Sequence, residues 1–553
     1  MKKYLFLIIA IALGTFLRLW QLSAVPNGLT WDEAAIGYNA YSILKTGRDE
    51  HGAFMPLIFK SFGDYKPGAY IYFTVPAVAI FGLNEFAVRF PSALAGILAI
   101  FGVYLLVKEL FSEKKLKPIR IFSIDINIWD FSAIALAVSP WHVHFGHGAW
   151  EVNVFSTVMV FAMYFFLRFI KNKSSIFPLI SLVCLSLATY QAAKMLTPFI
   201  FLFLAIVYWR DFWHQTLPLL KPRKIVPLLP FILFALWILF GSIFSSAGNR
   251  LATLSVFNYK PGISEATRQI DGSTSPYISL FHNQTELSFH MVMSRYLYHF
   301  SPEVLFYEGS LFSERAHIPS LGVLHPLEII WLVLGLIWLT RLFPNKQTIV
   351  ILGLLLIAPI PASLTLAEFS TYRALFMVIP LSIISGIGMY YGIQKIKWFI
   401  APVFLLYFIV SVYVFDIYFL HSQAVFAKEF NYGYKQAVEI IKENPTQRVI
   451  FTDVLGQPYI YYVFYTGYDP STYQKNIDFI DGGLDVGRVG HVGNVEFHQF
   501  GNDELTHLKD TLLVGSEGNI DRSFDITGEN VALFKQINTP DDKIIFRIVK
   551  TKP

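Results

Sequence analysis

Acidic and basic side chains follow one another in the first ninety residues, beyond the first apolar run of the chain. Asp32 and Glu33 are adjacent. Lys66 precedes a proline, and Arg89 follows shortly before a long series of apolar runs. A charged pair just past the end of a membrane helix is costly to keep unless it has a role. Carboxylates can accept protons, and lysine and arginine bind phosphate oxygens. This order therefore suggests a membrane enzyme whose chemistry takes place at the outer face of the bilayer.

The composition indicates a protein that lies mostly within a membrane. Of its 553 residues, 54% are hydrophobic and 15% are charged, whereas soluble domains carry about 25% charged residues. The single cysteine, Cys184, excludes an intrachain disulfide framework, and we interpret it as a small buried residue. The net charge of +5 is mild, and no nucleic-acid partner is predicted.

The apolar runs predict a polytopic helical protein. Runs of about 17 to 25 residues are candidate membrane helices. We expect about eleven, near residues 4–22, 86–110, 130–147, 150–169, 176–191, 195–209, 226–246, 325–341, 347–361, 373–391 and 397–418. The first run lacks a plausible cleavage site, so we interpret it as an uncleaved span.

Basic residues in short loops predict the orientation, because such loops stay on the cytoplasmic side. Lysine and arginine clusters occur in alternate loops, beginning with Lys2 and Lys3. The N-terminus is then cytoplasmic, and the loops 23–85 and 247–324 lie outside. Residues 67–83 would reverse this pattern if they crossed the bilayer, so we predict a juxtamembrane or re-entrant helix there.

The end of the chain has a different character. Residues 419–553 are less apolar and alternate polar with apolar residues. The segments predicted as strands are RVIFTDVL, PYIYYVFYTG, DTLLVGS, NVALFKQI and KIIFRIVK, whereas YGYKQAVEIIKEN is predicted as a helix. We therefore predict a transmembrane domain over residues 1–418 and a small α/β domain over residues 419–553, on the outer side of a plasma (inner) membrane.

With this topology, further polar groups are expected at the outer face. They are the histidines 142, 144 and 147, Glu151 and Arg373. Each has a plainer interpretation: an acid in a first helical turn is commonly a cap, and a cation near a span end commonly reaches to the interface. The histidine spacing matches no recognised ligand set, so polar packing is favoured over metal binding.

Four stretches of the sequence together resemble a known family. They are TWDEAAIGYNAYSIL, DYKPGAYIYF, FGLNEFAVRFPSALAG and SPWHVHFGHGAWEVNVF. In this order they resemble the GT-C glycosyltransferases, and within these the protein O-mannosyltransferase and lipid A aminoarabinose transferase group, which use polyprenyl-phosphate sugars. The resemblance covers about residues 1–420. It implies a GT-C-like membrane domain, whereas the C-terminal domain carries no equally clear signature.

The resemblance implies roles for the acidic residues. The first acid of the loop pair, here Asp32, would take the proton from the acceptor hydroxyl. Glu33 would orient the acceptor or the base, although a helix cap is an equally good interpretation. Glu151 matches the position of a second acid.

In the reaction that the resemblance implies, the phosphate of the donor leaves as an anion and requires cations to stabilise it. The candidates are Lys66, Arg89 and Arg373, with Arg18 a weaker one. Relatives in the wider superfamily use an Asp-x-Asp pair with a divalent ion, whereas here Asp32 and Glu33 are adjacent. We therefore predict no metal and no other cofactor. His147 stands where the family often has a basic residue.

Three functions compete. The leading hypothesis is an inverting glycosyltransferase that moves one sugar from a polyprenyl-phosphate donor to a lipid, glycan or protein acceptor outside the cytoplasm. A lipid or glycan transporter (flippase) would show related halves with polar groups at the bilayer midplane, and neither is evident. The third hypothesis is an inactive scaffold for other glycan enzymes. The loop 247–324 is interpreted either as a lid over the substrates or as a surface loop.

Overall fold

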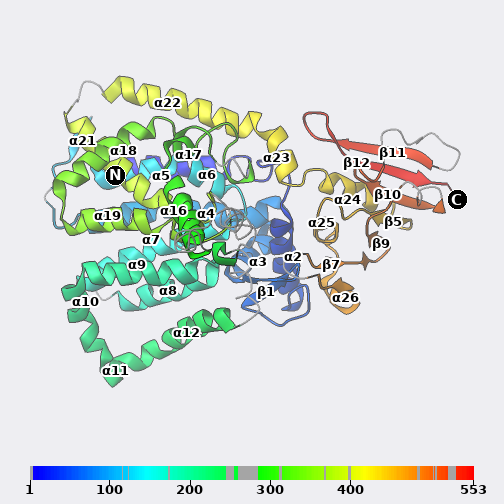
Figure 1. Ribbon diagram of the computed structural model, residues 1–553, viewed down its shortest axis with the longest axis horizontal. Helices are drawn as coiled ribbons and strands as arrows, with labels where there is room; N and C mark the ends of the chain where they lie inside the picture. The colour runs from blue at the N-terminus through cyan, green and yellow to red at the C-terminus, as the bar shows by residue number, and fades with distance from the viewer. Residues whose placement is uncertain are drawn as a thin grey trace, which may run out of the picture. The chain divides into compact units, whose positions relative to one another are not determined.

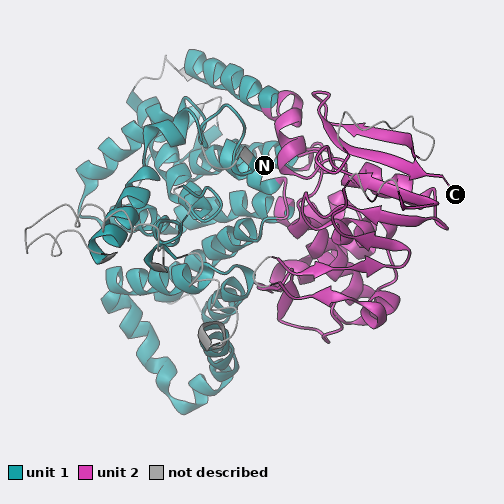
Figure 2. Ribbon diagram, turned by 45° about the vertical axis from the view of Figure 1, so that its right-hand side comes forward, with its two compact units in different colours: residues 1–18, 94–146, 150–417 teal, residues 19–93, 147–149, 418–553 magenta. Residues whose placement is uncertain are grey.

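The computed structural model is mainly helical, with strands concentrated in the C-terminal region (Figure 1). It describes residues 4–552 except 115, 122–123, 172–174, 245–254, 259–283, 310–313, 367–368, 396–399, 483–485, 502–503, 505–506 and 521–530. Contacts divide the chain into two compact units, coloured in Figure 2. Unit 1 comprises residues 1–18, 94–146 and 150–417, and unit 2 comprises residues 19–93, 147–149 and 418–553.

Unit 1 is mainly helical, and most of its helices are apolar. They are α1 (Leu5–Leu19), α4 (Glu85–Leu110, shared with unit 2), α5 (Ile128–Ala137), α6 (Pro140–Gly146), α7 (Glu151–Ile170), α8 (Ile176–Thr189), α9 (Ala193–Val207), α10 (Trp209–Thr216), α11 (Pro222–Ile225), α12 (Leu229–Phe244), α18 (Glu328–Leu342), α19 (Lys346–Ile357), α20 (Ile360–Ser363), α21 (Val378–Lys395) and α22 (Ile400–Asp416). Strands β3 (Ile119–Ile121) and β4 (Ile124–Ile126) pair antiparallel.

The helix lengths identify an integral membrane protein. Among the described residues, 6 helices are long and apolar enough to cross a membrane, or up to 7 if one pair bent by 102° forms a single span. Shorter apolar helices account for other predicted spans, so the number eleven stays a prediction. The run predicted as one span near 130–147 is two helices, α5 and α6. They are separated just before Pro140, because proline disfavours helical geometry in the residue that precedes it.

The predicted loop 247–324 is only partly described. Within it lie α16 (Gln284–Tyr298) and α17 (Pro302–Phe306), whereas residues 247–254, 259–283 and 310–313 lie outside the described residues. The interpretation as a lid stays a prediction.

Unit 2 combines an N-terminal segment with the C-terminal region. Its N-terminal elements are α2 (Trp31–Thr46), β1 (Ile58–Ser61), β2 (Asp64–Pro67), α3 (Ala69–Phe81) and the first turns of α4. Strands β1 and β2 form an antiparallel hairpin. The 13 residues of α3 span about 20 Å, less than the roughly 30 Å of a bilayer core. Helices α1, α5 and α8 are short as well, so the juxtamembrane or re-entrant position of residues 67–83 stays a prediction.

The C-terminal region contains a six-stranded mixed sheet in the order β11-β12-β10-β5-β9-β8. Strands β5 (Arg448–Phe451), β9 (Val495–Phe497) and β10 (Thr511–Gly515) are parallel, whereas β8 (His491–Val492), β11 (Val531–Asn538) and β12 (Ile544–Thr551) pair antiparallel to their neighbours. Strand β10 is buried throughout, as expected for a central strand. Helices α23 (Gln423–Glu429), α24 (Tyr434–Lys442), α25 (Pro458–Thr466) and α26 (Pro470–Asn476), and the β6 (Phe479–Ile480) and β7 (Arg488–Val489) pair, complete the region. The predicted α/β character is confirmed.

One predicted strand in this region is wrong. The segment PYIYYVFYTG forms helix α25. Its aromatic and β-branched residues favoured a strand, but Pro458 occupies the first helical turn and Gly467 ends the helix with a left-handed backbone (φ 60°). Residues 458–464 are buried without interruption. A helix that is apolar on every side is stable where its whole circumference is enclosed, and tertiary packing overrides the strand preference.

The C-terminal region holds α2 and the loop before it. The Tyr461 hydroxyl donates to the carbonyl of Leu29 at 3.0 Å, and the Tyr38 hydroxyl donates to the carbonyl of Tyr468 at 3.1 Å. Gly28 has a φ of 125°, and a Cβ atom there would lie 2.2 Å from the Phe430 carbonyl oxygen. Only glycine suits both the backbone and this close approach. The segment that carries Asp32 is thus fixed by residues more than 400 positions away.

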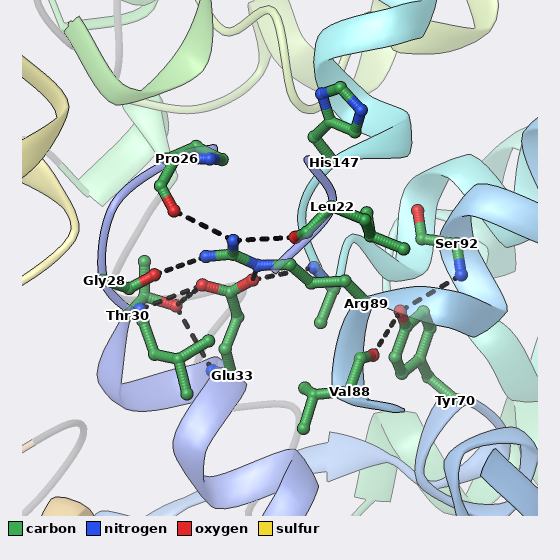
Figure 3. Close-up of polar contacts among 12 residues, drawn as sticks. Leu22, Pro26, Gly28, Thr30, Glu33, Tyr70, Val88, Arg89, Ser92 and His147 are labelled. Atoms are coloured by element: carbon green, nitrogen blue, oxygen red, sulfur yellow. Dashed lines mark hydrogen bonds and ion pairs between the residues drawn. The ribbon is translucent and has the colours of Figure 1, made fainter. Parts of the chain in front are cut away.

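Helix α3 fixes α4 at the turn that carries Arg89. The Tyr70 hydroxyl donates to the carbonyl of Val88 at 3.0 Å and accepts from the amide of Ser92 at 3.2 Å (Figure 3). These two backbone groups pair with each other in a regular α-helix. The insertion lies beside Pro91, which has no amide hydrogen to donate. A side chain inserted at a proline is a known cause of helix bending.

A Tyr70→Phe variant is expected to lose about 1–2 kcal/mol of stability, because the variant leaves the two buried backbone groups without their hydroxyl partner. Thermal unfolding of the purified protein measures the loss. Tyr72→Phe is the matched control, since the Tyr72 hydroxyl donates to the carbonyl of Pro56 at 2.8 Å in a more exposed position of the same helix. Equal losses in the two variants would contradict a special role for the insertion.

Candidate functional site

The first turn of α2 separates the two adjacent acids. Thr30 caps the helix and Glu33 completes a capping box, in which the Glu33 carboxylate accepts from the Thr30 amide at 2.9 Å. Neighbouring residues of a helix point about 100° apart, so Asp32 and Glu33 face different surroundings. The side chain of Asp32 is 44% exposed, and that of Glu33 is 5% exposed. The cap interpretation of Glu33 is confirmed, and Asp32 is the acid that is open to a ligand.

The guanidinium of Arg89 joins Glu33 to the preceding loop (Figure 3). Its Nε donates to Glu33 at 3.0 Å, and its terminal nitrogens donate to the carbonyls of Leu22, Pro26 and Gly28. The same Glu33 oxygen accepts from the amide of Ala149 at 3.0 Å. The side chain of Arg89 is 0% exposed. Arg89 was predicted to bind phosphate. In the structure its donors bind the Glu33 carboxylate and backbone carbonyls, and its side chain has no exposed surface.

The second ion pair, between Lys66 and Asp32, is accessible. The Lys66 ammonium donates to the Asp32 carboxylate, and the two side chains are 16% and 44% exposed. Lys66 lies in β2, where the following proline holds it extended as the sequence predicts. The Phe62 ring of the hairpin turn lies 5.5 Å from the ammonium. A carboxylate and an ammonium side by side can accept a proton and bind an anion in one place.

The sequence did not single out two buried polar residues of this part of unit 2. Asn39 lies seven positions after Asp32 on α2, and Glu50 lies in the loop after the helix. The Asn39 amide donates to Glu50 Oε1 at 2.9 Å, and the Glu50 backbone amide donates to Asn39 Oδ1 at 3.0 Å. Burial raises the pKa of Glu50 to about 8, and the Lys66 ammonium acts in the opposite direction. The seven-residue spacing places Asn39 on the face of Asp32 and was the available signal. Nothing in the sequence marks Glu50 as buried.

Glu151 and Arg373 belong to unit 1. Their chain neighbours Trp150 and Tyr372 are in edge contact, with ring centroids 5.2 Å apart. The guanidinium of Arg315 lies 6.0 Å from the Trp150 ring, a further cation that the sequence did not single out. Glu151 and Arg373 therefore lie on segments of unit 1 that contact each other through Trp150 and Tyr372. In unit 2 the structure pairs Asp32 with Lys66 and Glu33 with Arg89.

The remaining candidates have partners within the protein. Arg18 is fully buried and donates to the carbonyls of Leu136 and Ala137 at the end of α5 and to His142 Nδ1. It satisfies carbonyls that the break between α5 and α6 leaves without helical partners, so these donors of Arg18 bind groups of the protein. His144 contacts the carbonyl of Arg315, and His147 contacts the Tyr418 hydroxyl. Among the described residues, no group of three or more His, Cys, Asp or Glu side chains is arranged to hold a metal.

Solved structures show which fold this is. ArnT from Cupriavidus metallidurans, in the apo state, matches over 99% of this chain and 97% of its own, with 14% identity and a TM-score of 0.50. The same protein bound to undecaprenyl phosphate matches over 98% and 97%, with 13% identity and a TM-score of 0.50. The chain shares the ArnT fold. The GT-C-like fold that the resemblance implied is thereby confirmed.

Sequence comparison adds a local match. The model of the family described as dolichyl-phosphate-mannose-protein mannosyltransferase matches residues 66–117. This stretch begins at Lys66 and includes Arg89. No curated protein sequence matches the chain.

Proposed function

We propose that the protein is a membrane glycosyltransferase that moves a single sugar from a polyprenyl-phosphate donor to an acceptor outside the cytoplasm, with inversion at the anomeric carbon. The observation that carries the proposal is the accessible Asp32–Lys66 pair on a fold shared with ArnT. ArnT has been solved with undecaprenyl phosphate bound, which supports a lipid-linked phosphate as the ligand class.

The reaction assigns one role to each member of the pair. The acceptor hydroxyl oxygen attacks the anomeric carbon, and the bond between that carbon and the phosphate oxygen breaks. Asp32 takes the hydroxyl proton, and the phosphate leaves as an anion that the Lys66 ammonium stabilises. A single displacement inverts the anomeric centre. Glu33 and Arg89 keep the loop and the first turn of α2 in place, and no metal is assigned a role.

The acceptor and orientation form part of the same proposal. The acceptor is a lipid, a glycan or a protein, and the C-terminal region lies outside a plasma membrane with the N-terminus in the cytoplasm. The roles predicted for Glu151 as a second acid and for Arg373 as a second cation stay predictions.

The direct test uses purified protein in lipid vesicles with polyprenyl-phosphate sugars and candidate acceptors. Release of polyprenyl phosphate, together with a product heavier than the acceptor by one sugar, supports the transferase. A transporter would instead move the intact labelled donor between leaflets without releasing polyprenyl phosphate, and that outcome would replace the proposal.

Lys66→Met is expected to weaken the binding of undecaprenyl phosphate by roughly ten- to a hundredfold, because a charge-assisted hydrogen bond is lost. Titration of the purified variant with the lipid measures the change. The matched control is Lys60→Met in the same hairpin, where the lysine pairs with Asp481 at 3.4 Å. Unchanged affinity in Lys66→Met, or an equal loss in both variants, would remove Lys66 from the donor site.

A further inference from the structure

Glu50 is an acid enclosed by the protein close to the proposed donor site. It has no exposed surface, and its Oε1 and backbone amide are both bound to Asn39. Two hydrogen bonds to one asparagine fix the position of the carboxyl relative to α2. Because Asn39 lies on the same face of α2 as Asp32, the carboxyl is held at a defined place along the face that Lys66 contacts.

The other oxygen of Glu50 is unsatisfied. Glu50 Oε2 has no hydrogen-bond partner among the residues that the structure describes, and the same holds for the hydroxyls of Tyr459 and Tyr473. Both tyrosines are buried and interact electrostatically with Glu50. Buried polar groups are rarely left without partners, since each costs about 1–3 kcal/mol. Glu50 also interacts electrostatically with Lys66, the lysine proposed to bind phosphate, so a functional role explains a carboxyl kept at this cost better than packing does.

Several titratable groups of the described residues neighbour Glu50 or interact with it electrostatically. These groups come from α2, the following loop, β2, α25 and α26, and they are Tyr38, Asp49, His51, Lys66, Tyr459 and Tyr473. Burial raises the pKa of each of the three tyrosines, and burial also lowers the pKa of His51 to about 4, so these four stay neutral. Glu50 itself, with a pKa of about 8, is neutral at pH 7 and becomes charged in mildly alkaline solution.

We propose that Glu50 is a positioning residue of the donor site, which controls through its charge how freely the Lys66 ammonium binds a phosphate anion. The inference rests on the proposed function. While Glu50 is neutral, Asp32 is the carboxylate paired with Lys66, and the ammonium can also bind a phosphate. When Glu50 is charged, a second carboxylate attracts the ammonium and repels the phosphate, so binding weakens.

The test is the affinity of the full-length protein for undecaprenyl phosphate between pH 6 and pH 9. The wild-type affinity is expected to fall about tenfold across the ionisation of Glu50, as for two groups coupled by one pKa unit. Glu50→Gln cannot ionise, so its affinity relative to that of the wild type is expected to rise as the pH rises. The second ionisation of the phosphate, at a pKa of about 6, acts on both proteins alike. Glu85→Gln is the matched control in unit 2, because Glu85 pairs with Lys435 at 2.9 Å; it should retain the alkaline loss.

The outcomes separate the two proposals. An alkaline loss that persists unchanged in Glu50→Gln overturns the role of Glu50 and leaves the donor site intact. Absence of binding by the wild-type protein at every pH overturns the proposed donor. If Glu50→Gln does not fold, Glu50→Asp decides: the shorter acid should move the midpoint of the alkaline loss, and an unchanged midpoint overturns the inference.

Discussion

Asp32→Asn is expected to fold normally and to lose sugar transfer by roughly 10²- to 10⁴-fold, the usual contribution of a general base. Asparagine has nearly the same shape as aspartate but cannot take the proton of the acceptor hydroxyl. Because the change leaves Lys66 without its carboxylate partner, binding of the anionic donor should be unchanged or stronger. The loss should therefore appear in kcat rather than in KM for the donor. Release of polyprenyl phosphate at saturating donor measures it.

The control for this variant is a second aspartate–lysine pair of unit 2. Asp481 is 62% exposed and pairs with Lys60. Asp481→Asn makes the same chemical change without touching the site, and transfer should stay within twofold of wild type, consistent with the small worth of surface ion pairs, roughly 0–1 kcal/mol. Full activity of Asp32→Asn would show that another group accepts the proton.

Arg89→Ala is expected to be the most destabilising of the substitutions discussed, at about 3–5 kcal/mol. The change removes the partner of the buried Glu33 carboxylate and leaves three carbonyls, those of Leu22, Pro26 and Gly28, without their donor. Many such molecules should be unfolded or degraded, since this loss is a large part of a typical total stability. Unfolding of the purified variant, with its yield relative to wild type, measures the effect.

An exposed pair gives the comparison. Arg448 and Glu496 form an ion pair with side chains that are 52% and 36% exposed. Arg448→Ala should cost no more than about 1 kcal/mol. A double-mutant cycle of Arg89→Ala with Glu33→Gln should show strong coupling, because the second change neutralises the carboxylate that the first leaves unpaired. Additive losses would mean that the pair does not act as one structural element.

The gathering of charges could be predicted from the sequence, but their pairing and the role of each charge could not. Asp32 and Lys66 were expected at the same outer face, as base and phosphate ligand, and the structure joins them in an ion pair. Which of two adjacent acids faces the solvent depends on where α2 begins, and that is decided by the Thr30 cap and by Arg89. From the sequence alone, Arg89 was interpreted as a phosphate ligand. Three of its partners in the structure are backbone carbonyls, and a sequence does not show which carbonyls a side chain will bind.

In the C-terminal region, the sequence predicts most of the strands but not helix α25. Its strands were predictable where β-branched and aromatic residues are concentrated in a short segment, as in β12. Helix α25 was not, because enclosure on all sides removes the alternation that distinguishes a helix from a strand. Burial likewise decides the case of Glu50, since a polar loop sequence does not reveal which of its acids is enclosed.

Unit 2 is built from three separate stretches of the chain, and this has a consequence for biosynthesis. The hairpin and α2 leave the ribosome early, but Tyr461 and Phe430, which hold the loop before α2, are made more than 400 residues after that loop. At about 5–20 residues per second, the interval is roughly 20–80 s. The early segment must wait that long for its partners, so nascent chains truncated before residue 418 should remain susceptible to proteases in the segment around residue 30.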